Sequence, residues 1–160
     1  LKLLKDKNVK FKFLFAGEGE LSQELINLKN QLGLEEVEFM GFIDNCDELY
    51  KKLDIFILSS IFEGSSNSLI EAMSFKNAVI VSDIKSNLEI IDKERYGISY
   101  KVGNPEDLFE KLFDIINNKN KLLELKEKAL EGVKKNYDYN VKMKNLENQL
   151  IEMQDKINGK

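Results

Sequence analysis

The sequence predicts an α/β fold, a Rossmann-like three-layer domain with a parallel sheet. Strand-like and helix-like segments alternate repeatedly along the 160 residues, and this alternation is typical of parallel strands covered by helices. Two strand-like runs, 54–58 after its first residue Asp54 and 78–81 throughout, are continuously apolar, as expected for strands buried on both faces. The length fits one domain, so we expect residues 1–160 to form a single unit.

Each expected element follows from its local pattern. The first strand spans 10–16 and ends at Gly17-Glu18-Gly19. A helix is expected over 20–32, because apolar residues recur near the 3.6-residue period and Gly33 follows as a stop. The same patterns predict strands at 37–40, 54–58, 78–81 and 97–100, and helices at 47–53, 68–75, 87–91 and from Pro105 after the cap Asn104.

Both ends of the chain are expected to be helical. Beyond Lys119 the pattern is wholly helical, with a break near Tyr137 and a predicted final helix over 140–158. The chain opens with Leu1-Lys2-Leu3-Leu4-Lys5, which is typical of a helix interior and lacks an initiating methionine. We therefore expect the sequence to be a piece of a longer protein.

Composition excludes several classes of function. The net charge of −4 does not favour a nucleic-acid partner. The chain has no histidine, which excludes Ser-His-Asp and Cys-His catalysis and argues against a zinc site. Cys46 is the single cysteine, so a reducing compartment fits. The sequence has no apolar run of roughly 18 residues, and we expect a cytoplasmic protein.

A pair of glutamates, Glu63 and Glu71, flanks a turn of small polar residues. The turn consists of Gly64, Ser65, Ser66, Asn67 and Ser68. A strand, a small-residue turn and a helix N-terminus form an anion site, because unshielded amides and the helix dipole favour negative charge. Two carboxylates beside that site could hold the neutral hydroxyls of a sugar and a ribose. The pattern therefore indicates a nucleotide-sugar site.

Simpler roles for both acids stay open at this point. Ser68-Leu69-Ile70-Glu71 also fits the S-x-x-E capping box, in which Glu71 would cap its own helix. Glu63 could be an ordinary loop acid. Spacing alone does not decide between these interpretations.

The surrounding motifs carry a resemblance. Glu63-x7-Glu71, followed by the strand 78–83, resembles the signature of the retaining glycosyltransferases of the GT4 family (glycosyl transferases group 1), which have the GT-B fold. Further matches occur in the family's order between residues 10 and 120, at 13–19, 37–42, 49–60, 89–91 and 96–108. The resemblance implies the C-terminal, donor-binding half of a GT-B enzyme that transfers a sugar, with retention, to a glycan or lipid-linked acceptor. Bacterial surface polysaccharide synthesis is the expected pathway.

The resemblance also implies residue roles. Glu71 would hold the ribose hydroxyls of a UDP- or GDP-sugar, and Glu63 would contact the transferred sugar as the catalytic-site acid. The turn from Ser65 to Ser68 would meet the diphosphate through the amides of Ser66, Asn67 and Ser68. The ligand would approach the backbone closely at Gly17 and Gly19. The base would be contacted by Gly41, Phe42 and Ile43. No metal cofactor is implied.

Some parts of the family pattern differ or lie elsewhere. Ser59-Ser60 stands where the family often has Pro-Ser, and Ser65-Ser66 stands where it often has Phe-Gly. The diphosphate-clamping Arg and Lys and the N-terminal acceptor-binding domain would lie upstream. We therefore expect the isolated chain to be inactive, and we expect the full-length enzyme to have that domain as its partner, with peripheral membrane association left open.

The residues also bear on three alternative functions. A dinucleotide fingerprint would need a glycine where Ser22 stands, so NAD binding is disfavoured. A GT-B UDP-sugar 2-epimerase would rely on further acids and histidines. A non-catalytic α/β partner module, docked through its last helix, stays open.

Overall fold

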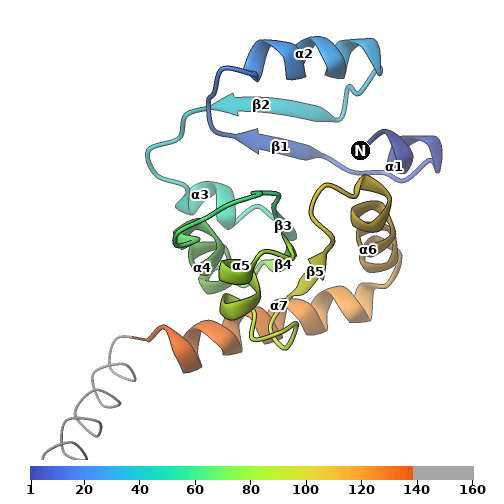
Figure 1. Cartoon of the computed structure of the whole chain (residues 1–160). Helices are drawn as coiled ribbons and strands as arrows, with labels where there is room; N and C mark the ends of the chain where they lie inside the picture. Colours follow the sequence, from blue (N-terminus) through green and yellow to red (C-terminus); the bar gives the residue numbers. More distant parts are fainter. Residues whose placement is uncertain (139–160) are drawn as a thin grey trace, which may run out of the picture.

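The computed structural model describes residues 1–138. Strands and helices alternate along the chain, as the sequence predicts (Figure 1). The strands are β1 (Phe13–Ala16), β2 (Val37–Gly41), β3 (Ile55–Leu58), β4 (Ala78–Ser82) and β5 (Ile98–Tyr100). The helices are α1 (Lys2–Asp6), α2 (Ser22–Gln31), α3 (Asp47–Tyr50), α4 (Asn67–Ser74), α5 (Lys85–Ile90), α6 (Pro105–Asn117) and α7 (Lys119–Asn136).

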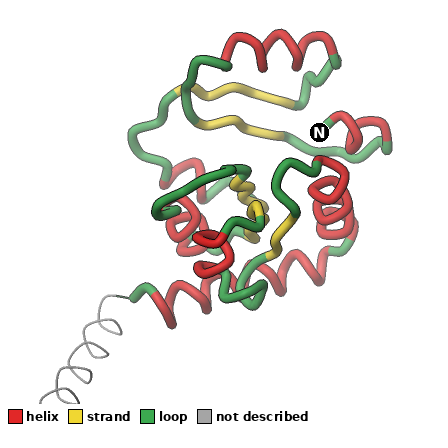
Figure 2. The backbone as a smooth tube through the Cα atoms, viewed as in Figure 1, coloured by secondary structure: helices red, strands yellow, loops and turns green. Residues whose placement is uncertain are grey.

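The predicted α/β class with parallel strands is confirmed, but the strands form two sheets where one was expected. β1 pairs with β2, and β3, β4 and β5 form a second sheet in that order, with every ladder parallel. Figure 2 shows the two strands of the first pair apart from the other strands. β1 and β3 are not hydrogen-bonded to each other. Apolar side chains of both strands instead line two cavities of about 450 and 550 Å³. A hydrophobic pattern predicts that a strand is buried, but it does not determine which strand pairs with it. The expectation of a single sheet is wrong for this reason.

β4 is the centre of the three-stranded sheet and is fully buried. Its side chains alternate between two apolar cores, with Val79 and Val81 in one and Ala78 and Ile80 in the other. α4 and α7 cover the first face, and α6 packs beside β5 on the second (Figure 1). This layering explains the unbroken apolar run of β4, since neither face meets water.

The predicted caps and stops are confirmed where backbone chemistry decides them. Asn104 begins α6 by accepting a hydrogen bond from the Asp107 amide at 3.0 Å. Gly33 follows α2 with φ of +62°, a left-handed conformation that suits glycine. Several boundaries shift: β1 begins at Phe13, α3 ends at Tyr50, and α5 begins at Lys85. α1 confirms a helix at the start of the chain.

Tyr96 and Gly132 form a tight contact between the β4 side of the core and α7. Tyr96 is 1% exposed. A β-carbon on Gly132 would lie only 2.6 Å from Tyr96 Cγ, so the backbone of α7 rests directly on the ring. The Tyr96 hydroxyl is buried and has no hydrogen-bond partner among the described residues.

We expect Tyr96→Phe to leave stability unchanged or to raise the free energy of unfolding by about 1 kcal/mol. The substitution removes a hydroxyl that loses its water on folding and gains no partner, while the ring stays in place. Urea unfolding of both chains measures the difference. A loss of more than about 1 kcal/mol would show that the hydroxyl does have a partner.

The predicted final helix, 140–158, lies outside the described residues. Within residues 1–138, no helix combines the length and the apolar character that a membrane crossing requires.

Candidate functional site

The ends of β1 and β2 meet in a glycine-rich corner. Gly17 and Gly41 both have positive φ, at 124° and 66°, and the Gly17 amide donates to the Gly41 carbonyl at 2.8 Å. The Glu18 carboxylate accepts a hydrogen bond from the Phe42 amide at 3.2 Å. A β-carbon on Gly41 would lie 3.2 Å from that carboxylate. Glycine is therefore required at Gly41 by its φ and favoured by the space around it.

This corner opens onto the cavity of about 450 Å³ between the sheets. The cavity brings together residues that are far apart in the sequence. Its lining includes Gly17, Phe42, Ile43, Tyr50, Ser60 and Ser68. Both groups of predicted site residues, one after β1 and β2 and the other after β3, thus contribute to one hollow.

The second group is organised around the start of α4. The helix begins at Asn67 with Ser66 as its N-cap residue, and no side chain caps it. The Ser65 hydroxyl donates to Asn67 Oδ1 at 3.2 Å instead. The Leu69 amide donates to the Ser66 carbonyl at 3.1 Å, whereas the amides of Asn67 and Ser68 make no backbone hydrogen bond within residues 1–138. These two amides are therefore free to meet an anion.

Glu71 does not close a capping box, so that interpretation is wrong in this structure. Its carboxylate accepts a hydrogen bond from the Tyr50 hydroxyl, with 3.1 Å between Oε2 and the phenol oxygen. Ser68 and Glu71 are three residues apart in α4 and share one face of the helix. Since Ser68 lines the cavity, Glu71 belongs to the cavity side of α4.

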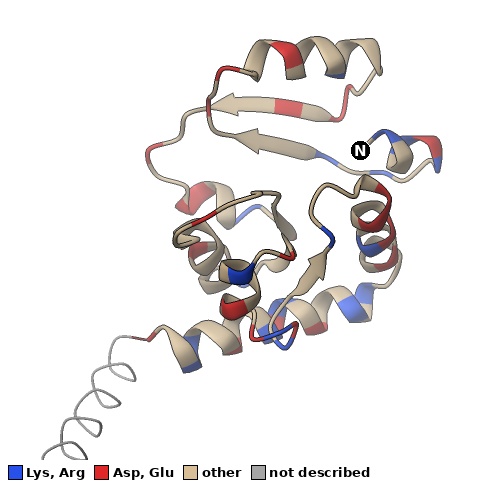
Figure 3. Ribbon diagram, viewed as in Figure 1, with Lys and Arg blue, Asp and Glu red and all other residues tan. Residues whose placement is uncertain are grey.

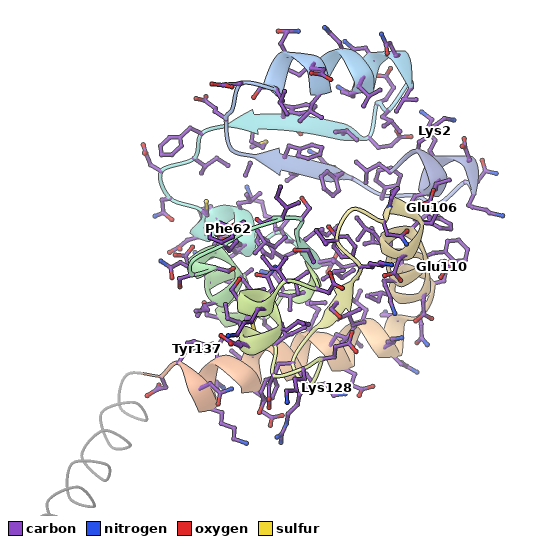
Figure 4. All side chains as sticks on the ribbon, in the orientation of Figure 1. Lys2, Phe62, Glu106, Glu110, Lys128 and Tyr137 are labelled. Atoms are coloured by element: carbon purple, nitrogen blue, oxygen red, sulfur yellow. The ribbon has the colours of Figure 1, made fainter. Side chains whose placement is uncertain are left out.

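Glu63 lies in the loop before α4 and is half-buried. It accepts a hydrogen bond from the Ser60 hydroxyl at 2.6 Å. Its neighbours Ile61 and Phe62 are exposed, at 81% and 85%, and Figure 4 shows Phe62 on the surface of this loop. Glu63 is therefore tied to the end of β3 and is separate from the Glu71 hydrogen bond.

A buried polar network holds the loop between β3 and α4. The Ser66 hydroxyl donates to Asn87 Oδ1 at 2.7 Å, and Asn87 Nδ2 donates to the Ser82 carbonyl at 3.2 Å and to its hydroxyl oxygen at 3.1 Å. The Ser82 hydroxyl donates to the Ser60 carbonyl. All three side chains are at most 2% exposed. The network therefore fixes both ends of the loop against β4 and α5.

The polar residues after β4 have structural partners. Asp83 accepts a hydrogen bond from the Val102 amide at 2.8 Å. Burial raises the pKa of Tyr100, and the charge of Asp83 raises it further. Lys85 lies 3.8 Å from the Glu89 carboxylate and is almost fully exposed. Neither Asp83 nor Glu89 caps α5, which has no side-chain cap.

The predicted site residues are thus brought together in part. Gly17, Phe42, Ile43 and Ser68 line the cavity, and Glu71 adjoins it through Tyr50. The residues outside the lining are Gly19, Gly41, Glu63, Ser65, Ser66 and Asn67, and Ser66 turns its side chain inward. Among residues 1–138, no group of three or more His, Cys, Asp or Glu side chains is placed to hold a metal ion.

Sequence reasoning missed Tyr50, Asn87 and Ser82 as site-supporting residues. Ser82 carries a signal, because it is a polar residue that continues the apolar run 78–81, and buried polar groups need partners. Asn87 stands among polar and charged residues and carries no such signal. Tyr50 carries no such signal, since a tyrosine fits an apolar helix face. In Figure 3, the positions of acidic and of basic residues alternate along the ribbon.

Three comparisons place this geometry among known proteins. A family model described as glycosyl transferases group 1 matches residues 1–132. A Campylobacter jejuni enzyme is 37% identical over 103 residues, covering 63% of this chain. It is named N-acetylgalactosamine-N,N'-diacetylbacillosaminyl-diphospho-undecaprenol 4-alpha-N-acetylgalactosaminyltransferase. The match spans 28% of that relative's length.

Solved structures agree with the sequence comparison. A variant of TarM from S. aureus, in complex with fondaparinux, alpha-GlcNAc-glycerol and UDP, superposes with a TM-score of 0.80 at 25% identity. The match covers 92% of this chain and 30% of TarM. The C-terminal domain of a glycosyl transferase group 1 family protein (LpcC) from Francisella tularensis has the same fold, with a TM-score of 0.70 at 21% identity. That match covers 84% of this chain and 91% of that domain.

Proposed function

Because this chain belongs to the glycosyl transferases group 1 family, we propose that it is the donor-binding part of a glycosyltransferase. In this proposal it binds a nucleotide-sugar, and the whole enzyme transfers the sugar with retention, as in the GT4 family, to a glycan or lipid-linked acceptor of bacterial surface polysaccharide synthesis. The epimerase and partner-module alternatives are not favoured, because the matched family and the named relatives are transferases.

One observation carries the proposal: the corner after β1 and β2 and the start of α4 converge on the same cavity. The amides of Asn67 and Ser68 make no backbone hydrogen bond within residues 1–138, and they supply the positive end of the α4 dipole to a diphosphate. Gly17 leaves room for close backbone approach, while Phe42 and Ile43 offer an apolar surface to the base.

The two glutamates then have separate tasks. Glu71 Oε2 is held by Tyr50, and its second oxygen is available to accept hydrogen bonds from vicinal ribose hydroxyls. Glu63, held by Ser60 on the loop before α4, would contact hydroxyls of the transferred sugar. Both carboxylates would meet neutral hydroxyls, which avoids repulsion from the diphosphate.

The named ligands of similar proteins guide the choice of donor. The TarM structure contains UDP, and the Campylobacter enzyme is named for transfer of N-acetylgalactosamine to an undecaprenol-linked glycan. We therefore propose a UDP-sugar as the first donor to test, with GDP as the comparison. No metal is part of the proposed binding, so chelation should leave the affinity unchanged.

Calorimetric titration tests the proposal. We expect the chain to bind UDP with a dissociation constant in about the micromolar to millimolar range, and Glu71→Ala to weaken it about tenfold, because the ribose loses a charged hydrogen-bond acceptor. Glu63→Ala should change UDP affinity less than about twofold and weaken binding of the intact UDP-sugar more strongly.

Glu110→Ala is the matched control. Glu110 is an exposed glutamate on α6, distant in Figure 4 from the loop that carries Phe62. The Glu110→Ala variant should bind UDP and the UDP-sugar with the affinities of the unsubstituted chain. The proposal is overturned if neither UDP nor GDP binds the unsubstituted chain, or if Glu71→Ala binds UDP with unchanged affinity.

A further inference from the structure

Tyr50 connects the core to the proposed ribose-binding acid. It ends α3, and its side chain is 4% exposed. Its hydroxyl donates to Glu71 Oε2 at 3.1 Å, while the same side chain lines the cavity. One buried tyrosine therefore touches both the cavity and the carboxylate on the neighbouring helix.

The Tyr50 ring is held on two sides. Phe75 stacks on it with 5.6 Å between ring centroids, and Phe56 of β3 meets it edge-on at 5.9 Å. The Tyr50 amide donates to the Cys46 carbonyl at 2.8 Å, which fixes the backbone of α3. Because ring and backbone are both fixed, the hydroxyl oxygen stays at one point beside α4.

Glu71 needs such a fixed point. Its residue is exposed on α4, and an exposed glutamate side chain samples several rotamers that must be given up when it binds a ligand. A hydrogen bond to Oε2 restricts those rotamers, and within residues 1–138 no hydrogen bond engages Oε1. A carboxylate has about four lone-pair positions, so one donor from Tyr50 leaves capacity for two ribose hydroxyls.

The Tyr50–Glu71 hydrogen bond also gives the buried Tyr50 hydroxyl a partner, but this need explains the contact less well than the positioning of Glu71 does. Tyr96 buries a hydroxyl with no partner in the described part of the chain, so this fold accepts such a group. Burial raises the pKa of the Tyr50 phenol, and the charge and hydrogen bond of Glu71 raise it further. Tyr50 is therefore neutral at physiological pH and keeps its proton for donation.

We propose that Tyr50 is a positioning residue, whose hydroxyl fixes Glu71 Oε2 so that Oε1 faces the vicinal ribose hydroxyls of a nucleoside diphosphate. The assignment rests on the proposed function, since it deepens the role of the same site. Tyr50 acts through Glu71 and touches the ligand with its ring at most.

The test is a double-mutant cycle read by UDP affinity. Tyr50→Phe keeps the ring between Phe56 and Phe75 and removes the hydroxyl. We expect it to weaken UDP binding about fivefold in the unsubstituted chain and less than about twofold in a Glu71→Gln background, because the two residues act as a unit. If Tyr50→Phe acted only by disturbing the structure, it would weaken UDP binding equally in both backgrounds.

The ligand offers a second readout. With 2′,3′-dideoxy-UDP, which has no ribose hydroxyls, Tyr50→Phe and the unsubstituted chain should bind within about twofold of each other. Tyr96→Phe is the matched control, since it removes a buried hydroxyl from another core tyrosine, and it should leave UDP affinity unchanged. Urea unfolding of each variant confirms that the compared chains are folded.

The outcomes separate this inference from the proposed function. If Glu71→Gln weakens UDP binding and Tyr50→Phe does not, the positioning role is overturned while the ribose role of Glu71 stands. The positioning role is also overturned if Tyr50→Phe weakens UDP binding equally in both backgrounds, or if it weakens the binding of UDP and of 2′,3′-dideoxy-UDP equally. If Glu71→Gln leaves UDP affinity unchanged, the proposed function fails and this assignment fails with it.

Discussion

Replacing Asn87 with leucine is expected to lower the free energy of unfolding by about 4 kcal/mol. The amide of Asn87 accepts from the Ser66 hydroxyl and donates to Ser82. Leucine has a similar size and neither function, so it leaves buried hydroxyl and carbonyl groups without partners. Each such group costs about 1–3 kcal/mol. Urea unfolding followed by circular dichroism measures the loss.

Asn117→Leu is the matched control for this substitution. Asn117 also donates from its amide to a backbone carbonyl, that of Phe113 at 2.7 Å, but on an exposed turn of α6. Its replacement should change the free energy of unfolding by less than about 0.5 kcal/mol. Equal costs for the two substitutions would contradict the assigned role of burial.

Ser66→Ala separates the hydrogen-bond network from simple packing. Alone it should cost about 1–2 kcal/mol, because Asn87 Oδ1 loses its donor. In the Asn87→Leu chain it should cost nothing further, since the Ser66 hydroxyl has already lost its acceptor and its removal leaves no additional unpaired group. Additive losses would show that the two residues act independently.

Replacing Gly132 with alanine is expected to destabilise the protein by about 3 kcal/mol. In an open helix this substitution would stabilise by about 0.5–1 kcal/mol, because alanine restricts the unfolded chain. Here the new β-carbon would come within 2.6 Å of Tyr96 Cγ and within 2.9 Å of Tyr96 Cβ and Cδ2. Tyr96 is buried and cannot withdraw, so α7 must move outward. Thermal unfolding of both chains measures the loss as a decrease in Tm.

Glu131→Ala tests whether the effect belongs to this contact. Glu131 is the exposed neighbour of Gly132 on the same turn of α7, and its replacement should stay within about 0.5 kcal/mol of the unsubstituted chain. Tyr96→Leu replaces the ring with a smaller side chain, so Gly132→Ala should destabilise the Tyr96→Leu chain less than it destabilises the unsubstituted chain. An unchanged or increased stability of Gly132→Ala alone would refute the tight packing.

Much of the fold can be read from local patterns, because local chemistry decides it. The apolar run of β4 and the Asn104-Pro105 start of α6 appear where the sequence predicts them. The split between β1 and β3 could not be predicted, since pairing depends on which strand edges meet in space. Helix ends also shifted where no cap residue marks them, as at α5.

The candidate site was predictable in its parts and not in its contacts. The glycines after β1 and β2 and the turn before α4 follow from residue types that parallel strands bring to one edge. The capping box at Ser68 and Glu71 was a fair local expectation, and a long-range partner displaced it. No sequence pattern links Tyr50 to Glu71 or Asn87 to Ser66, because each pair is 21 residues apart.

The separation between β1 and β3 has a consequence for how the molecule opens. The unit β1–α2–β2 pairs only within itself among the described strands, and α2 has no buried residue. Two-stranded units of this kind are marginally stable by themselves. This unit should therefore exchange its amide hydrogens through sub-global opening, well before the three-stranded sheet around β4 does. The glycine corner would then belong to the least protected cooperative unit, and the start of α4 to a more protected one.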